Sequence, residues 1–173
     1  GLELFDVEPM SIHGGTLRYY VGHKGAHHIS ERVAEYVRAE KAYGLYSEKR
    51  LTEFRQGVED GKIKLLDLLM ELKKEGKKII GISAPAKGNT LLNYCNIDTK
   101  LLDFITEKAE LKVGRFTPVA HIPIHHDDAL LTESAGYALI LAWNFADEIM
   151  KNLQAFKKGG GKFIIPIPTP KIV

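Results

Sequence analysis

The stretch Lys78-Ile-Ile-Gly-Ile-Ser-Ala-Pro-Ala-Lys-Gly-Asn-Thr-Leu-Leu-Asn93 decides the fold, because it joins a short apolar strand to a helix through a turn bounded by glycines. The turn runs from Gly81 to Gly88, and a helix opens at Asn89. Free backbone N–H groups and the dipole at the start of a helix favour an anion. The stretch therefore predicts a strand, turn and helix unit that accommodates a phosphate.

Strand-like and helix-like segments alternate after this unit. The expected elements are a strand at 101–106, an extended segment at 121–124, a strand at 137–142, a helix at 146–158 and a last strand at 162–165. Such alternation is typical of a parallel sheet with helices packed against it. The fold class expected is α/β, a Rossmann-like, mostly parallel sheet with flanking helices.

A different organisation precedes this core. Residues 2–7 and 16–21 alternate apolar and polar side chains, which predicts a two-stranded ribbon. Ser30 is placed to cap a first helix, and a second helical stretch begins near Ser47 and stops at Gly76. A break or bend is considered in that stretch at its two internal glycines, Gly57 and Gly61.

The predicted organisation has three parts: a ribbon at 1–28, a helical segment at 29–76 and a Rossmann-like core at 77–173. They form one compact domain, with the ribbon leading to a part of the protein that this chain lacks. The chain opens on an apolar, strand-like run without an initiator Met, so we expect a fragment of a longer protein.

Composition limits the partners. A net charge of +2 provides no strong positive field, so nucleic acid is not an expected partner. The single cysteine, Cys95, excludes an internal disulfide and is consistent with a reducing compartment. No apolar run is long enough to span a membrane. A cytoplasmic protein without a membrane partner is expected.

The spacing of the turn is a degenerate dinucleotide fingerprint. Gly81, Ser83 and Ala86 take the three glycine positions, and Glu107 lies about where a ribose-binding acid follows the next strand. A P-loop is excluded, because Lys87 precedes Gly88 instead of following it. A turn that binds no ligand stays open as the alternative.

Further candidate binding residues lie outside the turn. His13 stands beside Gly14 and Gly15, where the chain bends sharply. Arg115 can reach a phosphate from the loop after the second core strand. Trp143 and Asn144 end another strand, where open α/β sheets place ligand contacts. A structural histidine and a core aromatic are the alternatives.

Two groups of histidines raise the question of a metal site. They are His23, His27 and His28, and His121, His125 and His126 with Asp127 and Asp128. No helical His-x-x-x-His or carboxylate spacing organises them, so we expect solvated loop histidines and no metal.

Four motifs together resemble the C-terminal domain of S-adenosylmethionine-dependent sugar C-methyltransferases. They are Ile12-His-Gly-Gly-Thr-Leu-Arg18, Ser83-Ala-Pro-Ala-Lys-Gly-Asn-Thr-Leu-Leu-Asn93, Ile122-Pro-Ile124 and Trp143-Asn-Phe145. Their order and spacing match, and the resemblance runs from about Leu2 to Pro166.

The resemblance implies a three-part enzyme with a cysteine-rich zinc domain, a central S-adenosylmethionine-binding domain and this C-terminal domain. The base and the polarising groups, a Tyr and a Glu-His motif, then lie in the central domain, and the ribbon at 1–28 links this chain to that missing domain. A proton next to a sugar ketone is removed, and the enolate takes the methyl group. This domain positions a nucleotide-linked keto-sugar, binds no cofactor itself and is inactive alone.

The resemblance also implies roles for residues of this chain. The diphosphate or sugar is held by Ser83, Lys87, Gly88, Asn89 and Thr90, while His13, with Gly14 and Gly15, lies near an inter-domain cleft as an accessory group.

The sequence departs from the family pattern in the substrate loop. Glu107 stands where the family usually has Asp, Ala109-Glu110 replaces Asn-Pro, and Val119 replaces a Gly. The sugar therefore stays open. A non-catalytic nucleotide-binding module is the alternative function, and an independent NAD-dependent enzyme ranks last, because no catalytic Tyr-Lys pair is evident.

Overall fold

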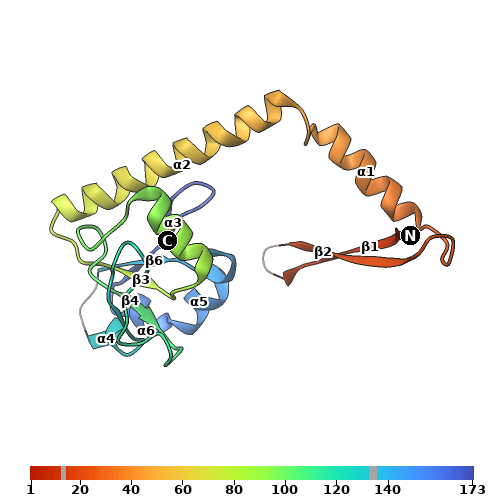
Figure 1. The fold of residues 1–173 in the computed structure, drawn as a ribbon. Coiled ribbons are helices and arrows are strands. Elements are labelled where there is room, and N and C mark those ends of the chain that lie inside the picture. The colour runs from red at the N-terminus through yellow and green to blue at the C-terminus, as the bar shows by residue number, and fades with distance from the viewer. Residues whose placement is uncertain (13–14, 133–135) are drawn as a thin grey trace. The chain divides into compact units, whose positions relative to one another are not determined.

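A computed structural model of the chain describes residues 1–12, 15–132 and 136–173. Its contacts divide it into two compact units, residues 1–57 and 58–173, and each unit has its own sheet (Figure 1). The three-part division drawn from the sequence stays a prediction.

The first unit contains the expected ribbon. Strands β1 (Leu2–Met10) and β2 (Thr16–His23) pair antiparallel, with Leu2 opposite His23 and Met10 opposite Thr16. A bulge between Leu4 and Asp6 shifts the register of β1. Both strands extend beyond the predicted ranges, because their ends continue the pairing.

Helix α1 (Glu31–Tyr43) follows the ribbon. The Ser30 hydroxyl accepts a hydrogen bond from the backbone N–H of Arg32 at 3.2 Å, which confirms the predicted cap. Gly44 ends the helix in the left-handed region, at φ 73°. All thirteen residues of α1 are described, and none of them is buried.

Helix α2 (Glu48–Lys74) is continuous through Gly57 and Gly61, so the break considered there does not occur. The boundary between the two units falls within this helix. In the second unit, its residues Leu65, Leu69 and Leu72 are buried in the main core.

The second unit is built on a six-stranded sheet in the order β5-β4-β3-β6-β7-β8. The strands are β3 (Ile79–Ile82), β4 (Ile105–Glu107), β5 (Ile124–His126), β6 (Tyr137–Ile140), β7 (Lys162–Ile165) and β8 (Lys171–Ile172). All neighbours pair in parallel except β7 and β8, which are antiparallel. The expected α/β class with a mostly parallel sheet is confirmed.

Several element boundaries predicted from the sequence are wrong. The strand expected at 101–106 begins only at Ile105, because the preceding residues form a turn after α3. The extended segment expected at 121–124 is also displaced, because β5 starts and pairs with β4 only at Ile124. The residues before it fold back through an antiparallel bridge between Phe116 and Pro123. The strand predicted last, β7, is followed by β8.

Helices cover both faces of the sheet (Figure 1). Helix α3 (Ala86–Cys95) shares one apolar core with the second half of α2. The other core contains residues of α4 (Ala129–Thr132), α5 (Ala146–Asn152) and α6 (Gln154–Lys158). The single helix predicted at 146–158 is therefore two helices, because Leu153 leaves helical geometry at φ −104° and ψ 34°.

The strand order places a topological switch point between β3 and β6. From β3 the chain moves outward to β4 and β5, and then crosses back to β6 on the other side of β3. In open α/β sheets, ligands bind in the crevice outside the carboxyl ends of the two strands at such a point. The turn after β3 and the short helix η2 (Trp143–Phe145) after β6 therefore frame the candidate site.

Candidate functional site

The turn between β3 and α3 holds Ser83 in the left-handed region, at φ 66°. The Ser83 N–H donates to the Thr106 carbonyl at 2.8 Å, which fixes the turn to the end of β4. A residue other than glycine at positive φ carries strain, and such positions gather at ligand sites. Ser83 occupies the second glycine position of the fingerprint, and its positive φ is one that glycine adopts without strain.

Helix α3 begins without a side-chain cap. It starts at Ala86, before the Asn89 predicted from the sequence, and its N-cap is Pro85, which accepts no hydrogen bond through a side chain. The N–H groups of the first turn of a helix have no acceptor within the helix. At α3 these groups belong to Ala86, Lys87 and Gly88, and the positive end of the helix dipole lies at the same place. This end of α3 can accept an anion.

Gly88 explains how closely α3 approaches the sheet. A Cβ at Gly88 would lie 2.8 Å from the Leu141 Cβ and 3.2 Å from the Leu141 carbonyl oxygen. In the dinucleotide fingerprint the third glycine permits such helix–strand packing. The spacing assigned that position to Ala86, which is exposed. The packing glycine therefore lies two residues later than the spacing indicates.

Lys87 meets the aromatic residues after β6. Its Nζ lies 4.9 Å from the centroid of the Trp143 ring and 5.6 Å from that of Phe145. Burial lowers the pKa of Lys87 below its ordinary value. Trp143 is half-buried, which is intermediate between a core aromatic and an open stacking platform. Next to it, the buried Asn144 Oδ1 has no hydrogen-bond partner among the described residues.

Glu107, at the end of β4, binds the backbone of the turn between β3 and α3. Its Oε2 accepts from the Ala84 N–H at 2.9 Å, and its Oε1 accepts from Lys108 and Ala109 N–H at 2.9 and 3.2 Å. The Lys112 ammonium lies 3.2 Å from the carboxylate. Burial acts to raise the pKa of Glu107, but the backbone donors and Lys112 outweigh it, and the net pKa is lowered.

The larger cavity of this region lies between α3 and the segment after β4, with a volume of about 500 Å³. The segment between β4 and β5 contains no helix, so α3 and this loop face each other over the sheet. Most of its walls are apolar, and the polar residues that line it are Asn89, Thr90, Lys112, Arg115 and Thr117. The Arg115 side chain makes no ion pair with a described residue.

A second cavity, of about 300 Å³, lies on the other side of the turn. Ser83, Glu107, Asp127 and Glu148 line it, together with Phe145. Burial raises the pKa of Asp127 above its ordinary value. A carboxyl group with a raised pKa in a cavity is a candidate for a functional role.

Sequence reasoning missed Lys112 as a site residue and met Asp127 only in the search for a metal. Asp127 directly follows β5, so its place at the carboxyl edge of the sheet was the available signal. Lys112 carried no such signal, because its role depends on the loop folding back toward Glu107 and the Ala84 carbonyl, which its Nζ reaches at 3.0 Å.

The structure brings most predicted site residues to one edge of the sheet. Glu107 is the last residue of β4. The residues that come after the carboxyl ends of β3, β4 and β6 are Ser83, Lys87, Gly88, Asn89, Thr90, Arg115, Trp143 and Asn144. Gly15 belongs to the first unit, at φ 108°. His13 and Gly14 lie outside the described residues. The binding roles of all these residues stay predictions.

The histidine groups do not form a metal site within the described part of the chain, where no three metal-ligating side chains gather. Instead, His126 Nδ1 lies 3.0 Å from an Asp128 carboxylate oxygen, and His125 stacks on Phe104 at 4.6 Å between ring centroids. In the same described ranges, no helix is long and apolar enough to cross a membrane.

A mostly parallel sheet with a switch point, an uncapped helix and two cavities at that edge define a Rossmann-like domain with a candidate ligand site. Residues 11–168 match the family model described as the C-methyltransferase C-terminal domain, and the chain belongs to that family. It is 32% identical over 174 residues to the C-methyltransferase NovU of Streptomyces niveus. That match covers 100% of this chain and 41% of the relative, so the chain spans less than half of the relative's length.

Proposed function

We propose that this chain is the substrate-holding domain of an S-adenosylmethionine-dependent C-methyltransferase that acts on a nucleotide-linked keto-sugar. The observation that carries the proposal is the 500 Å³ cavity, which opens beside the uncapped end of α3. Arg115 lines it and makes no ion pair with a described residue. An apolar cavity with a few convergent polar groups is typical of a small-molecule site.

The diphosphate is assigned to the start of α3. The N–H groups of Lys87 and Gly88 and the Arg115 guanidinium then supply donors to its oxygens, and Arg binds phosphate in a bidentate manner. Lys87 adds a charge from the Trp143 side, where its lowered pKa returns toward the ordinary value when an anion binds. Asn89 and Thr90 line the same cavity and orient the sugar or base.

Glu107 takes a positioning role in this arrangement. Both of its carboxylate oxygens already accept hydrogen bonds from the chain, and Lys112 lies beside them. It therefore holds the Ser83–Ala84 turn in place and does not reach a ribose. Because the Glu107 carboxylate already has these partners, it is not available to bind the ribose of an adenosine group at the end of β4. S-adenosylmethionine contains such a group, so this supports a methyl-donor site outside this chain.

Chemistry is assigned to the rest of the enzyme. S-adenosylmethionine, when bound by the parent protein, supplies the methyl group. The base that forms the sugar enolate is assigned to the methyl-donor-binding domain, which this chain does not include. The zinc site, the cytoplasmic location and the inactivity of the chain alone belong to this proposal. The residues present here bind and orient the substrate, so this domain acts on affinity and on alignment.

Calorimetric titration of the 173-residue chain tests the proposal. A nucleoside diphosphate and its glucose conjugate are titrated in parallel with NAD and S-adenosylmethionine. Binding of the first two alone supports a substrate domain. Binding of S-adenosylmethionine without the sugar nucleotide contradicts it, and binding of NAD supports the independent enzyme.

A matched pair of variants locates the site. Arg115→Gln should weaken nucleoside diphosphate binding by about tenfold or more, because a hydrogen bond to a charged group contributes about 1.5–3 kcal/mol. Lys100→Gln removes an exposed charge beyond the carboxyl end of α3 and should change affinity little. Equal effects of the two would show a diffuse charge effect and refute the assignment of Arg115. A nucleotide-binding module that serves no methylation would bind in the same way, but the sugar conjugate should then have no advantage over the diphosphate.

A further inference from the structure

The ribbon of the first unit pairs with no third strand among the described residues. Strands β1 and β2 form a sheet of their own, with nine and eight residues. A two-stranded ribbon is at best marginally stable in water, and a long unpaired edge invites a further strand. The two outer edges of this ribbon differ, and the difference indicates which one accepts a partner.

The register identifies the backbone groups that point outward from β2. Lys24 N–H donates to the Gly1 carbonyl at 3.0 Å, so these two residues form a hydrogen-bonded pair. Hydrogen-bonded and non-hydrogen-bonded pairs alternate along an antiparallel ladder. The bulge lies on β1, so the alternation along β2 is unbroken. Leu17, Tyr19 and Val21 therefore direct their N–H and carbonyl groups to the outer edge.

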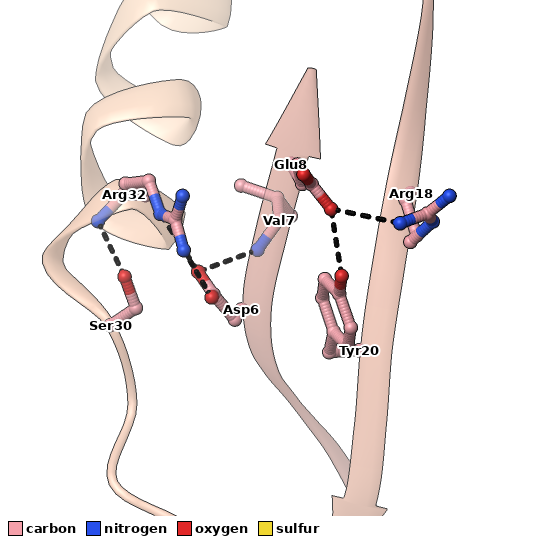
Figure 2. A network of polar contacts seen from close by, with 7 residues as sticks. All are labelled: Asp6, Val7, Glu8, Arg18, Tyr20, Ser30 and Arg32. Carbon is pink, nitrogen blue, oxygen red and sulfur yellow. Dashed lines mark hydrogen bonds and ion pairs between the residues drawn. The ribbon is translucent and has the colours of Figure 1, made fainter. Parts of the chain in front are cut away.

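The outer edge of β1 is blocked by the chain itself. Val7 N–H donates to its neighbour Asp6 at 2.9 Å, the Phe5 carbonyl accepts from Ser30 N–H at 2.8 Å, and Pro9 has no N–H. The Arg32 side chain holds the same Asp6 carboxylate from the start of α1, as Figure 2 shows. No strand can add to β1 without breaking these contacts.

The outer edge of β2 has no such block within the described residues, where the backbone groups of Leu17, Tyr19 and Val21 bond to neither a side chain nor another segment. The side chains of this set lie on one face of the ribbon with Leu2. Tyr19, Val21 and Leu2 are 61%, 54% and 65% exposed. The opposite face carries the polar cluster of Glu8, Arg18 and Tyr20 (Figure 2).

We propose that the outer edge of β2 pairs with a strand of the methyl-donor-binding domain of the same polypeptide, which makes the ribbon the border of that domain's sheet. The inference rests on the proposed function for its occupant. The matched relative carries 59% of its length (100% less 41%) outside the shared region, which is enough chain for a further domain. Val7, opposite Tyr19 on this face, is already buried, so the exposed apolar side chains are those of Tyr19 and Val21 on β2 and of Leu2. A neighbouring strand and its covering elements would bury these side chains together with the open edge.

Hydrogen exchange of the full-length protein and of the 173-residue chain tests this proposal. The amides of Leu17, Tyr19 and Val21 should exchange at least about 100-fold more slowly in the full-length protein, because a stable ladder protects its N–H groups. The inward amides of Arg18 and Tyr20 are in the β1 ladder in both proteins and serve as internal references. Equally fast exchange of the outward amides in both proteins would overturn the proposal.

A variant pair adds an independent measurement. Tyr19→Pro removes an outward N–H and is compatible with an edge, as Pro9 shows on β1. Tyr19→Thr keeps the N–H and serves as the matched control. Only the proline variant should remove the protection of Leu17 and Val21 in the full-length protein while the inward amides stay protected.

The same measurements identify other occupants. Protection in the isolated chain that rises with concentration, together with a dimer in sedimentation, would show that a second copy binds the edge and would overturn the proposal. A gene product without a further domain would do so as well. Nucleotide titration tests the substrate site separately, so a failure of that titration leaves the exchange result readable.

Discussion

Replacing Gly88 by Ala tests whether helix α3 is placed by its contact with the sheet. The added Cβ would lie 2.8 Å from the Leu141 Cβ, 3.2 Å from the Leu141 carbonyl oxygen and 3.2 Å from the Pro85 Cγ. None of these atoms is the far end of a flexible side chain. The helix must therefore move away from the sheet to accommodate the methyl group.

The magnitude follows from two opposing effects. Overpacking costs about 1–3 kcal/mol, and the contacts with backbone and Cβ atoms place Gly88→Ala in the upper part of that range. Alanine is favoured over glycine in a helix by about 1 kcal/mol at most. We expect a net loss of about 1–2 kcal/mol in the free energy of unfolding for Gly88→Ala, which corresponds to a decrease of roughly 2–8 °C in Tm for a chain of this length.

Gly57→Ala is the matched control, because Gly57 also lies within a helix but has no atom within 4 Å of its added Cβ. This variant should gain about 0.5–1 kcal/mol through helix propensity alone. Urea unfolding followed by circular dichroism gives both values, and the fluorescence of the single tryptophan, Trp143, reports on the α3 side of the sheet. Equal stabilisation by the two substitutions would refute the close packing at Gly88.

Three further outcomes are expected. Val119→Gly should raise the free energy of unfolding by about 1 kcal/mol, because a β-branched residue at φ 67° is strained. Leu111→Gly changes a similarly exposed loop residue and should not stabilise the protein. Thermal unfolding of the two variants distinguishes these outcomes. Glu107→Gln should destabilise by about 1–3 kcal/mol at neutral pH by removing a charged acceptor from three backbone N–H groups. Since the pKa of Glu107 is lowered in the fold, its contribution is present above the ordinary value of 4.5 and lost as pH falls through the folded pKa. Urea midpoints of wild type and Glu107→Gln should therefore converge in acid, and a constant difference would contradict this. Lys87→Met should weaken nucleoside diphosphate binding. In the wild-type protein the affinity should begin to fall below the ordinary lysine pKa of 10.5 as pH rises, since burial lowers the pKa of Lys87. Calorimetry across this pH range measures the affinity.

Val119 shows how sequence and structure complement each other. The sequence revealed only that valine stands where the resembling family has glycine. The structure provides the physical reason for the glycine, because the backbone at this position has a positive φ of 67°. Ser83 matches the resembling family but stands at a glycine position of the dinucleotide fingerprint, and its φ is also positive, at 66°. Both residues keep the backbone conformation that a glycine would adopt without strain.

Local patterns in the amino-acid sequence were enough to predict the α/β class, the antiparallel ribbon and a candidate site at the turn after Ile82. These patterns are apolar runs that alternate with helical spacing, a cap at Ser30, and a glycine-bearing turn between a strand and a helix. Such signals lie within a few residues of one another, so they can be read without knowing what packs against them.

Only the tertiary structure showed which residues already have partners within the chain and which are available to a ligand. Glu107 is bonded to the turn at Ala84, Gly88 is fixed by its contact with Leu141, and Arg115 faces a cavity without an ion pair among the described residues. The blocked edge of β1 and the open edge of β2 likewise depend on the contacts that the start of α1 makes with β1. Each of these facts joins residues far apart in the chain, because strand order and crossover decide which of them meet.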